Sequence, residues 1–224
     1  MSLVCFSQHD SLKSPAKPGL YALTPDFDFS LVLEQCTELM ESSLLSVLQL
    51  RRKEVSARVR LAEAVALKEL CATHGVTLVI NDDTDLAFEV QAGVHLGQGD
   101  GSLARARERL GEKALIGRTC HSSLALAEQA AHEGASYVAF GAYRSSQTKP
   151  GADVLPDGFV EKITTHQAPV CLIGGMVPRD TKLLGGSVRW VAASSSVFAN
   201  EPSVFALQMS AWRHALSEHL SVQV

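Results

Sequence analysis

Short apolar runs alternate with longer segments of helical spacing along most of this chain. The runs are rich in Val, Ile, Leu and Ala and lack polar interruptions, as strands do when helices cover both faces of a parallel sheet. We predict eight strands, at residues 20–24, 44–50, 76–80, 93–96, 114–117, 137–141, 170–173 and 190–193.

Between these runs, apolar residues recur at every third or fourth position, which is the spacing of one helix face. One such segment begins after Ser56, an N-cap residue type, and ends before Gly75, the commonest helix-stop residue. The same spacing predicts further helices at residues 103–110, 123–132, 159–166, 179–184 and 203–220.

Strand and helix therefore alternate eight times, which predicts an α/β protein with a single (β/α)8 TIM barrel. An open doubly wound sheet is the alternative, because alternation alone does not reveal whether a sheet closes. No Pro-rich or Ser-rich linker interrupts the pattern. We therefore predict a flexible N-terminal tail at 1–18 and one barrel catalytic domain at 19–224.

The composition excludes several classes of protein. The 224 residues carry a net charge of −4, without the basic surface of a nucleic-acid binder. No apolar stretch is long enough for a membrane span or a signal peptide, so we expect no membrane partner. The five cysteines are an odd number and are widely spaced, which favours the reducing cytoplasm over a disulfide framework.

Polar residues follow the ends of the predicted strands, where barrel enzymes place their active sites. Gln49, Arg51 and Lys53 alternate at the end of the second strand, so their side chains point to the same side. Arg144 and Lys149 lie with three hydroxyl residues after the sixth strand. Each group taken alone is typical of a solvated turn, whereas together they would line one mouth of one barrel.

Two acids, Asp82 and Asp100, follow neighbouring strands. Asp is also a common helix N-cap, but paired carboxylates without thiolates suit a hard cation such as Mg²⁺. The seventh and eighth strands end in Gly174-Gly175 and Ser194-Ser195, where barrels commonly hold a monophosphate on backbone N–H groups. These residues alone predict an enzyme that handles two phosphorylated ligands, with its reaction left open.

From residue 19 to about 198 the chain resembles the thiamine-phosphate synthase family. The shared motifs are Gln-x-Arg-x-Lys at 49–53, Asn-Asp at 81–82 and Gly-Val-His-Leu-Gly-Gln-x-Asp at 93–100. A hydroxyl-x-Thr-Lys loop at 146–149 and Ile-Gly-Gly at 173–175 match as well. The order of these motifs along the chain is that of the family.

The resemblance implies that hydroxymethylpyrimidine diphosphate and hydroxyethylthiazole phosphate are joined to give thiamine monophosphate and pyrophosphate. It implies Mg²⁺ on Asp82 and Asp100. The residues implied to contact the pyrimidine substrate or its leaving group are Gln49, Arg51, Lys53, Asn81, Thr119 and Lys149, with Arg51, Lys53 and Lys149 as catalytic cations. Those implied to hold the thiazole phosphate are Ser146, Thr148, Gly175, Ser194 and Ser195. The family's chemistry is dissociative and proceeds through a pyrimidine cation.

Two other functions remain as alternatives. A thiazole tautomerase on the same barrel would use an acid–base residue, for which His121 is the candidate. A non-catalytic sensor would bind a thiamine precursor without turnover. In each case the expected partners are small molecules, and a homo-oligomer is compatible with the sequence.

Overall fold

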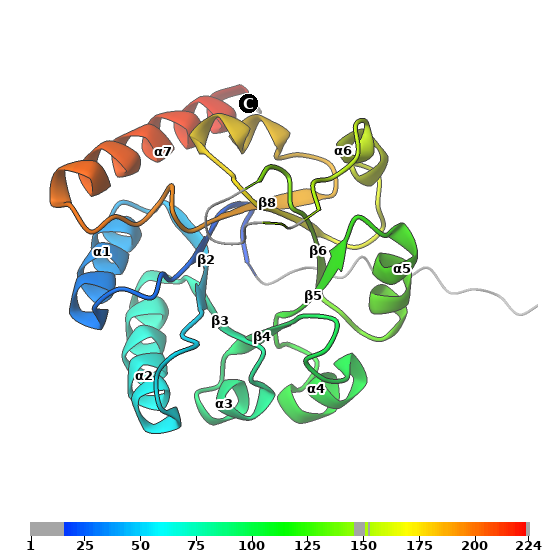
Figure 1. Cartoon of the computed structure of the whole chain (residues 1–224), viewed down its shortest axis with the longest axis horizontal. Helices are drawn as coiled ribbons and strands as arrows, with labels where there is room; N and C mark the ends of the chain where they lie inside the picture. Colours follow the sequence, from blue (N-terminus) through cyan, green and yellow to red (C-terminus); the bar gives the residue numbers. More distant parts are fainter. Residues whose placement is uncertain (1–15, 146–150, 152, 223–224) are drawn as a thin grey trace, which may run out of the picture.

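The computed structural model describes residues 16–145, 151 and 153–222 of the chain. Its eight parallel strands pair in chain order and close into a barrel, because β1 (Gly19–Leu23) pairs with both β2 (Leu45–Leu50) and β8 (Val188–Ala193). Figure 1 looks into this barrel and shows the helices around it. The predicted (β/α)8 barrel is confirmed, and the open doubly wound sheet is excluded.

The remaining strands also follow the predicted order. They are β3 (Thr77–Asn81), β4 (Gly93–Leu96), β5 (Ile116–His121), β6 (Tyr137–Phe140) and β7 (Val170–Ile173). The helices are α1 (Phe29–Glu41), α2 (Ala57–His74), α3 (Thr84–Glu89), α4 (Leu103–Leu110), α5 (Leu124–His132), α6 (Phe159–Ile163) and α7 (Pro202–Val222), with the 3₁₀ helix η1 (Pro178–Leu183) before β8.

Local chemistry sets the helix ends. The Ser56 side chain accepts a hydrogen bond from the Val59 N–H, and Gly75 ends α2 in the left-handed conformation, as predicted. The helix predicted at 179–184 is instead the 3₁₀ helix η1. At the start of η1, the Asp180 carboxylate accepts a hydrogen bond from the Val177 N–H. Leu184, the residue after η1, has an extended backbone. The six residues of η1 make about two turns of a 3₁₀ helix.

The fifth strand begins and ends later than predicted. Its last residues include the polar Arg118, Thr119 and His121. The apolar run that predicted this strand therefore ends before the strand does. Arg118 is nevertheless buried, because its guanidinium donates to two carbonyls of the turn after β4. Tertiary hydrogen bonds therefore extend β5 through residues whose polarity suggested a loop.

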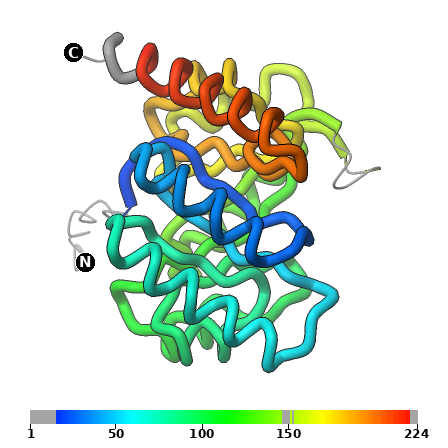
Figure 2. The backbone as a smooth tube through the Cα atoms, turned by 90° about the vertical axis from the view of Figure 1, so that its left-hand side faces the viewer, coloured from blue at the N-terminus to red at the C-terminus, as the bar shows by residue number. Residues whose placement is uncertain are grey.

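Two apolar layers hold the fold together. One lies between the strands and the surrounding helices, and the other fills the barrel interior around Tyr21, Tyr137 and Trp190. In the described part of the predicted tail, residues 16–18, Ala16 is buried at this interior, whereas Lys17 and Pro18 are exposed. The Trp190 indole donates to the Lys17 carbonyl at 2.8 Å. Figure 2 shows α7, α1 and α2 stacked along one side of the barrel.

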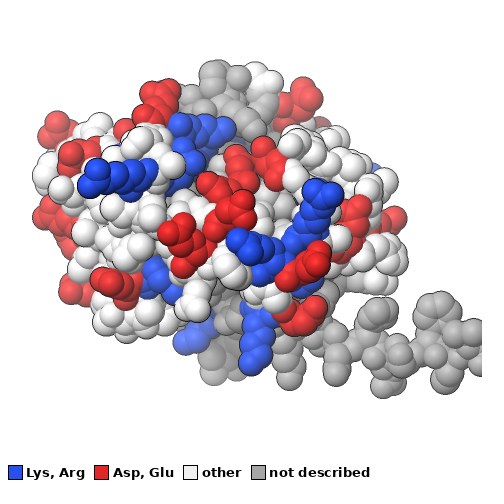
Figure 3. Space-filling model, turned by 90° about the horizontal axis from the view of Figure 1, so that it is seen from below, with Lys and Arg blue, Asp and Glu red and all other residues white. Residues whose placement is uncertain are grey.

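The surface carries charged side chains of both signs. On the face shown in Figure 3, Lys and Arg lie among Asp and Glu and form no extended basic area on the residues drawn there. No helix in the described part of the chain is long and apolar enough to cross a membrane. The four cysteines that the structure describes (Cys36, Cys71, Cys120 and Cys171) are free and buried, as expected of small core residues.

Candidate active site

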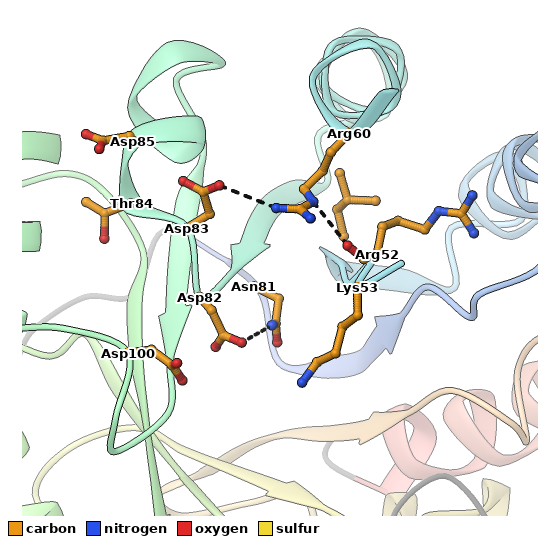
Figure 4. Close-up of a pocket in the computed structure, with 10 residues that line it drawn as sticks. Arg52, Lys53, Arg60, Asn81, Asp82, Asp83, Thr84, Asp85 and Asp100 are labelled. Carbon is orange, nitrogen blue, oxygen red and sulfur yellow. Dashed lines mark hydrogen bonds and ion pairs between the residues drawn. The ribbon is translucent and has the colours of Figure 1, made fainter. Parts of the chain in front are cut away.

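A pocket of about 580 Å³ opens at the carboxyl ends of β2, β3 and β4. Figure 4 shows its lining, with Lys53, Asn81, Asp82 and Asp100 directed towards a common space. The complete lining is Leu50, Arg52, Lys53, Arg60, Asn81, Asp82, Asp83, Thr84, Asp85 and Asp100. Both predicted metal ligands, and two residues predicted to contact the pyrimidine substrate, therefore line one pocket.

The backbone at the end of β3 turns Asp82 into the pocket. Asp82 has φ +64°, a left-handed conformation that Asp tolerates better than most residues. Its N–H donates to the His95 carbonyl of β4 at 2.8 Å, and its Oδ2 accepts from the Asn81 amide at 2.5 Å. A neighbouring strand and a neighbouring side chain thus fix this carboxylate.

Asp100 is held by the turn that follows β4. Its Oδ2 accepts the Gly97 N–H at 3.0 Å, and a Cβ at Gly97 would lie 2.5 Å from the same oxygen. The Arg118 guanidinium donates to the carbonyls of Gly97 at 2.6 Å and Gly101 at 3.0 Å. Glycine at 97 and the buried Arg118 therefore determine where Asp100 presents its carboxylate.

The two carboxylates repel each other across the pocket. Burial, followed by the nearby Asp100 charge, raises the pKa of Asp82, while Lys53 and the Asn81 hydrogen bond act in the opposite direction. A divalent cation would relieve this repulsion. Among the described residues no group of three or more His, Cys, Asp or Glu could hold a metal. A pair of carboxylates with free positions suits Mg²⁺, which usually keeps several of its waters.

The three consecutive cations after β2 have different environments. Lys53 points into the pocket, whereas Arg52 points away and donates to both Glu63 oxygens at 2.8 and 3.0 Å. Because Glu63 is 4% exposed, this pair holds α2 against the barrel. Arg51 lies 3.5 Å from Asp26, outside the set that lines the pocket. Arg51 would have to turn from Asp26 to reach a ligand there.

Two predicted substrate-binding residues reach into the barrel. The Gln49 amide donates to the Tyr21 hydroxyl at 2.7 Å, and the Thr119 hydroxyl contacts His95 Nε2 at 2.8 Å. Burial, then the Arg118 charge, lowers the pKa of His95 to about 4, so the imidazole is neutral at pH 7. His95 belongs to the matched motif at 93–100, yet its contact with Thr119 was not predicted.

The predicted phosphate turn lies at the ends of β7 and β8. Gly175 has φ +60°, and a Cβ there would lie 2.9 Å from the Arg144 Cβ, so only glycine fits comfortably. Ser194 and Ser195 follow β8. The Ser194 carbonyl accepts hydrogen bonds from the N–H groups of Val197 and Phe198. The N–H groups of Gly175 and Ser195 donate no hydrogen bond to another described residue.

An ion pair that the sequence pattern did not reveal supports this turn. The Arg144 guanidinium contacts both Asp180 oxygens, at 2.6 and 2.7 Å, and donates to the Gly175 carbonyl at 3.1 Å. Burial opposes ionisation of Asp180, but its hydrogen bonds from Arg144 and the Val177 N–H prevail and lower its pKa. Arg144 was expected only as a loop cation.

The remaining candidates divide into two groups. Ser146, Thr148 and Lys149 lie outside the described residues. His121, the residue assigned to the tautomerase alternative, is exposed at the end of β5, with φ +52°. It does not line the pocket that holds the two carboxylates.

The model of one protein family, described as thiamine monophosphate synthase, matches residues 20–197. This match spans most of the chain and includes all the strand ends described above. The chain belongs to the thiamine monophosphate synthase family.

Solved structures agree with this membership. A thiamine phosphate pyrophosphorylase from Pyrococcus furiosus is 26% identical over 92% of this chain and 98% of its own, with a TM-score of 0.76. A 2-keto-3-deoxy-6-phospho-gluconate aldolase from Zymomonas mobilis (19% identity, 92% and 95% coverage, TM-score 0.64) shares the fold. So does a 3-keto-L-gulonate-6-phosphate decarboxylase from Vibrio cholerae (14%, 90% and 99%, 0.60). The first similarity and the family match identify this thiamine monophosphate synthase family member as a transferase.

Proposed function

We propose that this family member joins hydroxymethylpyrimidine diphosphate to hydroxyethylthiazole phosphate, forming thiamine monophosphate and pyrophosphate with the help of Mg²⁺. The observation that carries the proposal is the pocket in which Asp82 and Asp100 converge opposite Lys53. Two carboxylates and one cation match a metal-bound diphosphate better than they match a neutral ligand or a lone anion.

In this proposal Asp82 and Asp100 hold Mg²⁺. The bound ion would neutralise charge on the diphosphate oxygens as the leaving group departs. Asn81 orients Asp82 through its 2.5 Å hydrogen bond, and Arg118 orients Asp100 through the turn at 97–101. These hydrogen bonds behind the two carboxylates matter because small errors in the position of a metal ligand reduce the affinity for the metal.

The other predicted residues divide between the two substrates. Arg51, Lys53 and Lys149 stabilise the diphosphate. Gln49, Asn81 and Thr119 orient the pyrimidine or its leaving group, and the thiazole phosphate is held by Ser146, Thr148, Gly175, Ser194 and Ser195. The N–H groups of Gly175 and Ser195, which have no acceptor among the residues that the structure describes, support the last assignment.

The reaction needs no proton transfer at its central step. The bond between the pyrimidine methylene carbon and the diphosphate oxygen breaks, and the leaving group keeps both electrons. The thiazole nitrogen then donates its lone pair to the resulting cation and forms the new carbon–nitrogen bond. Lys53 favours the first step because negative charge on the leaving group grows as the bond breaks. Positioning of the two substrates favours the second.

A pyrophosphate-release assay with both substrates and Mg²⁺ tests the proposal. We expect pyrophosphate and thiamine monophosphate to form in equal amounts, with negligible pyrophosphate when the thiazole phosphate is omitted. A tautomerase would convert its thiazole substrate without pyrophosphate, and a sensor would bind without turnover. Either result would replace the proposed reaction.

A further inference from the structure

A continuous chain of hydrogen bonds crosses the barrel interior. The Gln49 amide nitrogen contacts the Tyr21 hydroxyl at 2.7 Å, which contacts the Tyr137 hydroxyl at 2.8 Å. Tyr137 contacts His95 Nδ1 at 2.9 Å, and His95 Nε2 contacts the Thr119 hydroxyl at 2.8 Å. The chain thus joins two predicted substrate-binding residues, Gln49 and Thr119, through three residues to which no role was assigned.

Gln49, at one end of this hydrogen-bond chain, sets the direction in which the hydrogens are donated along it. An amide nitrogen can only donate, so the Tyr21 oxygen accepts from Gln49. Tyr21 is 1% exposed, and its own hydrogen therefore needs the Tyr137 oxygen as acceptor. Tyr137, which is fully buried, must then donate to His95 Nδ1. A neutral imidazole that accepts at Nδ1 carries its hydrogen on Nε2 and donates it to Thr119.

The opposite tautomer does not fit this arrangement. With its hydrogen on Nδ1, His95 would donate to Tyr137, and the two phenols would have one acceptor fewer than they have hydrogens. One buried phenol hydrogen would then have no partner. A buried hydroxyl hydrogen without an acceptor costs free energy, so with Gln49 as the donor this tautomer is disfavoured.

We propose that this chain fixes the Thr119 hydroxyl as a hydrogen-bond donor towards the ligand, which makes Tyr21, Tyr137 and His95 positioning residues. Because His95 already donates to the Thr119 oxygen, the Thr119 hydrogen remains available for the half-exposed mouth of the barrel. A committed donor favours an anionic oxygen over a ligand that itself donates. The identity of that ligand, a diphosphate oxygen, rests on the proposed function, whereas the direction of the chain does not.

Nitrogen-15 NMR of the imidazoles tests the direction in the intact protein without any ligand. A His95→Gln variant identifies the His95 signals by their loss. At pH 7 we expect His95 Nε2 to carry the hydrogen and Nδ1 to show the signature of a lone pair that accepts a hydrogen bond. A hydrogen on Nδ1, or an average of the two tautomers, would overturn the proposal.

Two phenol deletions provide a matched comparison. Tyr21→Phe leaves Tyr137 able to donate to His95, so the Nδ1 signal should stay close to the wild-type position. Tyr137→Phe removes the donor itself, so the Nδ1 signal should move to that of an unbonded lone pair or a mixed tautomer. Equal Nδ1 signals in Tyr137→Phe and wild type would show that Tyr137 is not the donor. The wild-type spectrum decides the direction if either variant fails to fold.

The ligand part is tested by calorimetric binding of inorganic pyrophosphate with Mg²⁺. Thr119→Val keeps the shape of the side chain but lacks the hydroxyl and should bind about tenfold more weakly, whereas Thr119→Ser should stay within about threefold of wild type. Equal binding by the Val and Ser variants would overturn the donor role. A wild-type protein that binds no pyrophosphate would overturn both the identity of the ligand and the proposed function. The imidazole signals would still report the direction of the hydrogen-bond chain.

Discussion

Arg144 places its guanidinium on both carboxylate oxygens of Asp180, although Arg144 lies in the loop after β6 and Asp180 lies in η1, after β7. The Asp180 side chain has no solvent exposure, and the same guanidinium also donates to the Gly175 carbonyl. The pair therefore connects the loop after β6 with the turn after β7. This connection fixes the glycine turn that we assign to the thiazole phosphate.

Loss of Arg144 should destabilise the fold and weaken this turn. Arg144→Ala leaves the Asp180 carboxylate buried without its partner, which costs about 3 kcal/mol of unfolding free energy at neutral pH. The KM for thiazole phosphate should rise more than the KM for pyrimidine diphosphate. Urea unfolding and steady-state kinetics measure the two effects. The control is Arg109→Ala, whose exposed ion pair with Asp85 should cost less than about 1 kcal/mol.

The same pair predicts how stability depends on pH. The Asp180 pKa is lower in the folded protein than in the unfolded chain, so its contribution is complete above the unfolded pKa of about 4. That contribution disappears as the pH falls towards the folded pKa. Wild type should therefore lose more unfolding free energy than Asp180→Asn between pH 5 and pH 3. Denaturant unfolding across this range measures both losses. Equal losses of unfolding free energy in the two proteins would contradict the prediction.

The proposed metal ligands should act on the Mg²⁺ requirement more than on the fold. Asp82→Asn and Asp100→Asn each remove one anionic ligand, so half-maximal activity should need at least about tenfold more Mg²⁺. Asp85→Asn is the matched control, because Asp85 also lines the pocket but its side chain is 90% exposed and pairs with Arg109. Mg²⁺ titrations of activity that coincide for all three variants would exclude the metal assignment.

Lys53 should contribute mainly to the chemical step. Lys53→Met removes a positive charge that points into the pocket, and the single-turnover rate should fall about a hundredfold, while thiazole phosphate affinity changes little. Arg52→Met serves for comparison, because Arg52 pairs with Glu63 and points away from the pocket. We expect that variant to lose stability rather than intrinsic rate. A larger rate loss in Arg52→Met would reverse the two roles.

The sequence was sufficient to predict the barrel because its signals are local. Each strand is a short apolar run, and the polar residues that follow parallel strands necessarily gather at one end. Asp82, Asp100 and Lys53 could therefore be placed together from sequence. Their exact orientations depended on features without a local signal, such as the left-handed backbone of Asp82.

Contacts between distant residues could not be predicted in this way. Tyr21 and Tyr137 are separated by 116 residues and meet only because the strands close in one particular register. Arg144 and Asp180 lie 36 residues apart, the first in a predicted loop and the second in a predicted helix, and neither position carries a local sign of its partner. A single sequence contains no pattern that pairs such residues.

A crystal structure with Mg²⁺ and pyrophosphate tests the proposed site most directly. We predict Mg²⁺ bound by Asp82 and Asp100, with the pyrophosphate coordinated to the metal and contacted by Lys53. Arg51 should leave Asp26 for the anion, since their 3.5 Å ion pair is partly exposed and weak. Pyrophosphate bound away from this pocket, or bound here with no metal between the two carboxylates, would contradict the proposed mechanism.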